Sequence, residues 1–166
     1  AVEEKPVLEG VILRMGIGLA DGHALLHQLD SMDENQLTDL REAYWRGMAK
    51  HVEVEAEGQI LLDKYPLSLT RIPYIARLFP ASHTVCLLRH PCDAVLSCYM
   101  QAFGLNGGAL AFSSLASTAR AYVQVMSYWE EQKQRVGCRM HVLRYEDLVA
   151  DFRNVMQNLT GFLALP

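Results

Sequence analysis

Three short apolar runs, each followed by a helical pattern, constrain the fold of this chain most. The runs are residues 59–63 (QILLD), 84–88 (TVCLL) and 141–144 (HVLR). Each run is rich in valine, isoleucine or leucine and short, which is typical of a buried parallel strand. The alternation of strands with helices predicts an α/β fold, with a parallel β-sheet flanked by helices in one domain over residues 1–166.

Apolar residues at three- and four-residue spacing predict the helices. The clearest pattern lies within residues 33–52 and consists of Leu37, Leu40, Tyr44 and Met48. Ser31, followed three residues later by Glu34, predicts a capping box at the start of this helix. Further helices are predicted over residues 71–78, from 91 onward, over 113–135 and after 147, with one or two short helices within 6–30 and turns at 57–58 and 106–108.

A cation or a phenol follows each apolar run. Lys64 comes directly after the first run, Arg89 after the second and Tyr145 after the third. In open α/β sheets, ligands bind in the crevice outside the carboxyl ends of the strands. Two cations and a phenol at this edge therefore predict an anion-binding site.

The composition limits the classes of function. The 166 residues carry a net charge of −4, so no basic footprint indicates a nucleic-acid partner. Hydrophobic residues make up 51% and charged residues 20% of the chain, which is typical of a folded globular domain. No apolar stretch approaches the ~18 residues that indicate a membrane span. An anion must be held by a local group of cations, for which the candidates are Lys64, Arg71, Arg77, Arg89 and Arg144.

Neither the cysteines nor the paired histidines form a metal-binding motif. The four cysteines lack C-x-x-C spacing, and His23 and His27 lack the glutamate of the zinc-protease motif. We therefore expect no metal. Free cysteines favour a reducing compartment, and we expect a cytoplasmic protein.

Arg89 and Ser97 are the strongest candidates for binding a phosphate. An arginine that leaves a strand offers a planar fork of donors, and the helix beginning near Pro91 adds backbone N–H groups and a positive dipole end. Ser97 lies one helical turn after Asp93, on the same face. The alternative is an arginine paired with Asp93 and a serine that is only a surface hydroxyl.

Lys64, Tyr145 and Glu4 are the remaining candidates. Lys64 is a compact charge able to neutralise a leaving group, but it could also be a solvated strand-end lysine. Tyr145 could stack on a base or donate to a phosphate, or pack against the last helix. Glu4 could act as a general base toward a hydroxyl, although Glu3 and Glu4 also read as two exposed acids near a terminus.

At these residues the sequence resembles the sulfotransferase family, whose P-loop-related α/β enzymes use 3′-phosphoadenosine 5′-phosphosulfate (PAPS). The resemblance covers residues 60–150 and is closest to tyrosylprotein sulfotransferases and to related bacterial sulfotransferases, which often carry tetratricopeptide repeats. The matching segments, in order, are DKYPL at 63–67, IARLFP at 75–80, LRHPCD at 88–93 with Ser97, and YEDLV at 145–149.

The resemblance implies a role for each candidate residue. Arg89 and Ser97 would bind the 3′-phosphate of PAPS, and Tyr145 would help to hold the nucleotide. Lys64 would be the catalytic lysine that stabilises the bridging oxygen of the donor. Glu4 would match the base of the acidic pair found in tyrosylprotein sulfotransferases. No metal is implied.

One departure from the family pattern matters. The family begins its core with a glycine-rich loop of the Arg-Ser-Gly-Thr type, which cradles the 5′-phosphosulfate, and no such loop occurs here; Gly16-Ile17-Gly18 does not match it. We therefore expect an incomplete sulfotransferase core, a piece of a longer protein that also lacks the C-terminal donor-binding segment. Such a piece would be inactive alone, and apolar surface left by missing strands could drive self-association.

The expected reaction is transfer of a sulfuryl group from PAPS to a hydroxyl acceptor, which could be peptidyl tyrosine, a carbohydrate or a small phenol. One alternative is a nucleotide or nucleoside kinase of related topology, for which Asp63 could hold magnesium but the Gly-Lys-Ser/Thr loop is missing. The other alternative is a catalytically dead, sulfotransferase-like binding domain. Members of the family also occur in the Golgi lumen, so the cytoplasmic expectation does not follow from the resemblance.

Overall fold

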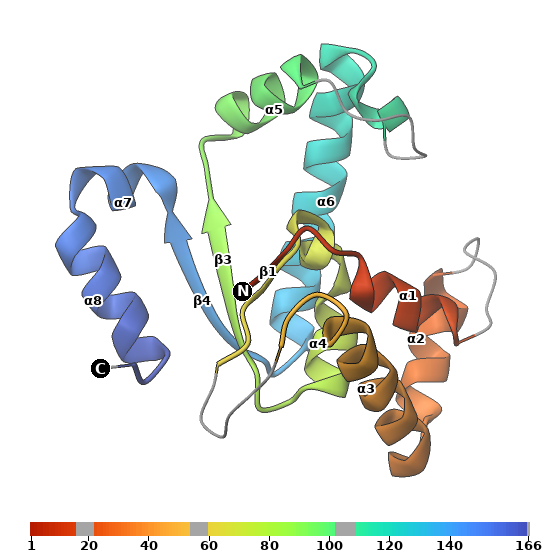
Figure 1. Ribbon diagram of the computed structural model, residues 1–166. Coiled ribbons are helices and arrows are strands. Elements are labelled where there is room, and N and C mark those ends of the chain that lie inside the picture. Colours follow the sequence, from red (N-terminus) through yellow and green to blue (C-terminus); the bar gives the residue numbers. More distant parts are fainter. Residues whose placement is uncertain (16–21, 54–59, 102–108, 166) are drawn as a thin grey trace. The chain divides into compact units, whose positions relative to one another are not determined.

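The computed structural model describes residues 1–15, 22–53, 60–101 and 109–165 (Figure 1). The chain forms two compact units, Ala1–Pro80 and Ala81–Pro166, and each unit contains helices and one parallel pair of strands. The predicted α/β class with parallel strands is confirmed. Within the described residues the strands are hydrogen-bonded as two parallel pairs, β1 with β2 and β3 with β4.

The first unit is mainly helical. It combines helices with one short pair of strands, and the expectation of one or two short helices within residues 6–30 is confirmed by α1 and α2. Residues 16–18, which carry the Gly-Ile-Gly sequence, lie outside the described residues, as do the predicted turns at 57–58 and 106–108. The elements are β1 (Val2–Glu3), α1 (Val7–Leu13), α2 (Gly22–Ser31), α3 (Glu34–Met48), β2 (Asp63–Lys64), the 3-10 helix η1 (Pro66–Arg71) and α4 (Ile72–Leu78).

Strands β1 and β2 run parallel over two residues each. Val2 pairs with Asp63 and Glu3 with Lys64. Two backbone N–H groups, those of Val2 and Glu4, donate to the carbonyls of Leu62 and Lys64, each at 2.7 Å. The predicted strand at 59–63 was therefore placed too early: residue 59 lies outside the described residues, 60–62 are not in a strand, and Lys64 belongs to the strand itself.

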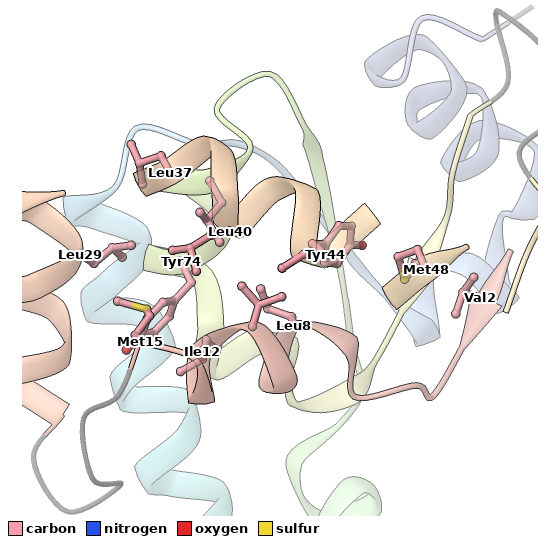
Figure 2. Close-up of a cluster of buried hydrophobic side chains, with 13 residues drawn as sticks. Val2, Leu8, Ile12, Met15, Leu29, Leu37, Leu40, Tyr44, Met48 and Tyr74 are labelled. Carbon is pink, nitrogen blue, oxygen red and sulfur yellow. The ribbon is translucent and has the colours of Figure 1, made fainter. Parts of the chain in front are cut away.

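The core of the first unit forms where one face of α3 meets α1, α2 and α4 (Figure 2). The apolar positions of α3 predicted from their spacing are all buried, as expected for an amphipathic helix. Val2 of β1 joins the same cluster, so the short strand is tied to the core by its side chain. The buried residues are Val2, Leu8, Val11, Ile12, Met15, Leu29, Leu37, Leu40, Ala43, Tyr44, Met48, Tyr74 and Leu78.

Helix α3 begins with a capping box, but not with the one that the sequence predicted. Asp33 is the N-cap: its carboxylate accepts from the Gln36 N–H at 2.9 Å, and its own N–H donates to the Gln36 side chain at 3.0 Å. Ser31 instead ends α2, and its hydroxyl donates to the Gln28 carbonyl. Both Ser31 and Asp33 have the required spacing, and the extended backbone needed at an N-cap occurs at Asp33.

The second unit is built on a longer strand pair. β3 and β4 are parallel over six residues each, with Cys86 opposite Val142. They confirm the runs predicted at 84–88 and 141–144 and begin one and two residues earlier, respectively. The elements are β3 (His83–Leu88), α5 (Pro91–Met100), the 3-10 helix η2 (Ala109–Phe112), α6 (Leu115–Arg135), β4 (Arg139–Arg144), α7 (Tyr145–Ala150) and α8 (Phe152–Phe162).

Aromatic contacts hold α8 against the strand pair. The ring of Phe162 lies 5.2 Å from those of His83 on β3 and His141 on β4, measured between ring centroids. Because β3 and β4 are parallel, α5 and α7 both begin at the same edge of the pair (Figure 1). The candidate residues Arg89 and Tyr145 lie at this edge, directly after β3 and β4.

We predict that Tyr44→Phe destabilises the first unit. The buried Tyr44 hydroxyl donates to Asp63 Oδ2 at 2.8 Å, and Oδ1 of the same carboxylate is buried without a hydrogen-bond partner in the described part of the chain. Loss of the hydroxyl would leave both oxygens unsatisfied, so we expect the free energy of unfolding to fall by about 1–3 kcal/mol. Urea denaturation would measure the change. Tyr99→Phe, which removes the hydroxyl of a 45%-exposed ring, is the control, and equal stabilities for the two variants would refute the prediction.

Candidate active site

Two glutamates and a lysine meet at the end of the β1–β2 pair. Lys64 Nζ lies 2.6 Å from Glu4 Oε1, with a hydrogen bond between them, and 3.1 Å from Glu3 Oε1. The sequence identified Glu4 and Lys64 as separate candidates, 60 residues apart, and the structure brings them into contact. Lys64 stands at the end of its strand and both glutamates are exposed, as the alternative reading expected, but the three charges are paired with one another.

The backbone explains why these three residues meet. The register places Glu3 directly opposite Lys64, and the Glu4 N–H donates to the Lys64 carbonyl. Glu4 has a φ of 56°, in the left-handed region that a residue with a side chain adopts at a cost of about 1–2 kcal/mol. Such strain persists where the surrounding contacts hold it, and it is concentrated at functional sites.

The electrostatics of the group keep Lys64 charged. The hydrogen bond to Glu4, and then that to Glu3, raise the pKa of Lys64 above its ordinary value. Because the pKa is raised on folding, these ion pairs stabilise the folded protein when the pH is below the ordinary pKa of lysine. This stabilisation is lost as the pH rises through the raised pKa. At neutral pH the group therefore combines an ammonium donor with two carboxylate acceptors, and all three side chains remain open to solvent.

Lys64 is positioned by a contact that the sequence did not reveal. Its neighbour Asp63 accepts the hydroxyl of Tyr44 from α3, so the buried face of that helix fixes the strand that carries the lysine. Burial first, and then the hydrogen bond to Asp63, raise the pKa of Tyr44, which stays a donor. The helical periodicity predicted that Tyr44 is buried, but it gave no sign of its partner.

Arg89 and Tyr145 form the centre of a second group, in the second unit. Arg89 follows β3 and Tyr145 begins α7 directly after β4. Because Leu88 pairs with Arg144, the residues that follow them are also brought together, and the guanidinium carbon of Arg89 lies 5.6 Å from the centroid of the Tyr145 ring. The ring of Tyr145 is 45% exposed, so one part of it is available to a ligand.

Ser97 lies on the helix that follows Arg89, and both residues line one hollow. The hollow has a volume of about 420 Å³ and is lined by Arg89, Asp93, Leu96, Ser97, Met100 and Gln101. α5 begins at Pro91, as predicted. The predicted alternative pairing also occurs, but Arg89 Nε and Asp93 Oδ2 are 3.9 Å apart, which is a loose, exposed contact. The structure therefore places Arg89 beside the ring of Tyr145 and in the same hollow as Ser97. The contact with Asp93 is too loose to fix the guanidinium in one orientation.

The other candidate cations have structural partners. Arg71 makes two hydrogen bonds to Glu9, at 2.7 and 2.9 Å. Arg77 donates to the carbonyl of Met32, and Arg144 lies 3.7 Å from Glu146 Oε2. The contacts of Arg71 and Arg77 hold separate elements of the first unit together. Lys64 and Arg89 also have carboxylate neighbours, so the sequence motifs, not a lack of partners, distinguish them as candidates.

Metal binding and membrane insertion would each require particular structural features. Among the described side chains, which do not include those of residues 16–26, no group of three or more His, Cys, Asp or Glu is placed to hold a metal ion. In the described part of the chain, no helix is long and apolar enough to cross a membrane. Cys86 is buried in β3, and burial raises the pKa of its thiol to about 11, so it remains protonated near neutral pH.

The fold and these two groups define an α/β protein with cations at the ends of parallel strands. The chain matches the Sulfotransferase family over residues 13–166, and it belongs to that family. No curated protein matches the chain closely enough to be identified as a relative.

We predict that Glu4→Gln lowers the pKa of Lys64 more than Glu3→Gln does. The hydrogen bond to Glu4 is the larger cause of the raised pKa and the shorter contact, so its charge matters more. An NMR titration that follows the side-chain signals of Lys64 would measure both changes. Glu42→Gln, which removes the same charge from a pair with Arg46 on α3, is the control. A larger decrease with Glu3→Gln would contradict the geometry.

Proposed function

We propose that this protein transfers a sulfuryl group from PAPS to a hydroxyl acceptor. The observation that carries the proposal is the contact between Lys64 and Glu4, because it places a cation beside a carboxylate in a member of the sulfotransferase family. A cation suits the charge that develops on a leaving group, and a carboxylate suits the proton that an attacking hydroxyl must lose.

Arg89, Ser97 and Tyr145 fit the nucleotide part of the donor. Bound PAPS would supply the activated sulfuryl group. Arg89 and Ser97 line one hollow, and their guanidinium and hydroxyl groups can donate to a phosphate, which an arginine binds in a planar, bidentate manner. The half-exposed ring of Tyr145 offers a flat apolar surface or a hydroxyl donor next to that arginine.

Lys64 and Glu4 would perform the transfer chemistry as a coupled pair. Lys64 stays protonated because of its carboxylate neighbours and can donate to an oxygen that gains negative charge. Glu4 is the base, and a proton taken from the acceptor removes its charge and weakens its hold on Lys64. Glu3, at 3.1 Å, still attracts the ammonium and keeps it in place. Positioning and electrostatics would supply most of the rate enhancement in such a loose, in-line transfer, and we propose that no metal takes part.

The acceptor belongs to the class of hydroxyl compounds. The resemblance to tyrosylprotein sulfotransferases makes peptidyl tyrosine the first acceptor to test, followed by a small phenol and a carbohydrate. We also propose that the donor's phosphosulfate is held by a loop without a counterpart in residues 1–166, so these 166 residues alone would be inactive. The experiments below therefore use the full-length protein.

The donor is tested by thermal-shift and calorimetric titration with adenosine 3′,5′-bisphosphate, compared with ATP and magnesium. We expect the bisphosphate to bind and to raise the melting temperature, because Arg89 and Ser97 suit a ribose phosphate. Arg89→Ala should weaken bisphosphate binding by about 10- to 100-fold, as loss of a hydrogen bond to a charged group implies. Arg135→Ala, which removes an exposed arginine paired with Glu131, is the control. Binding of ATP with magnesium in preference to the bisphosphate would favour a kinase and sink the proposal.

We predict that Lys64→Ala lowers turnover by at least ~100-fold, the usual loss when one preorganised charge-stabilising donor is removed. The dissociation constant of the bisphosphate should change little, because Lys64 is assigned to the leaving group and not to the nucleotide phosphate. Release of the bisphosphate in the presence of PAPS and a tyrosine-containing peptide or a small phenol would measure turnover. Lys50→Ala is the control for an exposed lysine in the same unit. Turnover close to that of the unsubstituted protein would refute the role of Lys64.

A further inference from the structure

A carboxylate from α7 holds the junction between β3 and α5. The backbone N–H of His90 donates to Glu146 Oε1 at 2.8 Å, across 56 residues of sequence. His90 is the N-cap residue of α5 and follows Arg89 directly, and no side chain of the junction itself caps the helix. By accepting from the N–H of the N-cap residue, the carboxylate of Glu146 does from a distant element what the N3 glutamate of a capping box does in other helices.

The carboxylate of Glu146 is partly shielded and charged, which suits it to act as an anchor. Its Oε2 is shielded and has no hydrogen-bond partner in the described part of the chain, although Arg144 Nε lies 3.7 Å away. The N–H of His90, and then the N–H of Glu146 itself, lower the pKa of this carboxyl, so it is ionised at neutral pH. A charged acceptor forms a stronger hydrogen bond to a backbone N–H than a neutral acceptor does.

The first two residues of α7 thus contact two successive residues of the β3–α5 junction. Tyr145 packs under the guanidinium of Arg89, and Glu146 binds the backbone of His90. We infer that Glu146 is a positioning residue, which fixes the backbone beside Arg89 so that the guanidinium is oriented toward the nucleotide phosphate. This inference rests on the proposed function.

The direction in which nucleotide affinity changes when the Glu146 carboxylate is removed distinguishes positioning from simple electrostatics. Glu146 is an anion close to a site that is proposed to bind an anion, so its charge alone opposes binding. If only charge mattered, removal of the carboxylate would strengthen nucleotide binding. If Glu146 holds the junction, its removal lets Arg89 adopt other orientations, and binding weakens because the lost order must be restored on binding.

The experiment measures the dissociation constant of adenosine 3′,5′-bisphosphate, by calorimetry on the full-length protein, for three variants. We expect Glu146→Ala to weaken binding by about tenfold, as loss of one charged hydrogen bond in the support of a site implies. Glu146→Gln keeps an acceptor oxygen for His90 and should stay within about threefold of the unsubstituted protein. Asp147→Ala removes an exposed carboxylate from the same helical turn and should leave binding unchanged or slightly tighter.

A second measurement does not depend on the nucleotide. Hydrogen exchange of the His90 amide, followed by NMR, should become faster in Glu146→Ala and stay slow in Glu146→Gln and Asp147→Ala. Unchanged or tighter bisphosphate binding in Glu146→Ala would overturn the inference and leave the proposed function intact. Failure of the unsubstituted protein to bind the bisphosphate would overturn the proposed function, and with it the nucleotide role of Glu146. Unchanged His90 exchange in Glu146→Ala would overturn the anchor itself.

Discussion

The parallel pairing of β1 with β2 is the constraint on which the Lys64 group depends. A pair of strands two residues long has little stability of its own. Val2 is buried in the helical core, and Asp63 is bound by Tyr44 of α3, so the core holds both strands in register. Because Glu3 lies opposite Lys64 in that register, the packing of apolar side chains fixes the distance between the charges.

In each unit, a hydrogen bond to a neighbouring residue supports an exposed cation. The residue before Lys64 is Asp63, held by Tyr44, and the residue after Arg89 is His90, held by Glu146. In each case a side chain from a distant element binds the neighbour of the cation and leaves the cation itself exposed. Such support orients a charged group without consuming its hydrogen-bonding capacity, which is what preorganised binding requires.

The sequence predicted the elements that carry a clear apolar pattern. α3 and α6 were located to within a few residues because apolar residues repeat along them at helical spacing, and β3 and β4 because each contains a short continuous apolar run. β1 has only two residues and no period, and its existence depends on backbone hydrogen bonds to residues 62 and 64. The site residues were named from motifs, but their contacts were not: the Lys64–Glu4 pair depends on register, and the role of Glu146 depends on a backbone N–H that every residue other than proline has.

The carboxylates beside each cation do not prevent it from binding an anion. Arg89 and Asp93 are 3.9 Å apart and both about half exposed, and exposed ion pairs contribute only about 0–1 kcal/mol, so a ligand that replaces Asp93 loses little. The Lys64 pairs are shorter but also exposed, so solvent screens them as well. Meanwhile Asp93 and Glu146 repel anions that approach without matching the donors of Arg89 and Ser97. In a chain with a net charge of −4, the selectivity of the proposed site for an anion would therefore come from the geometry of a few donors.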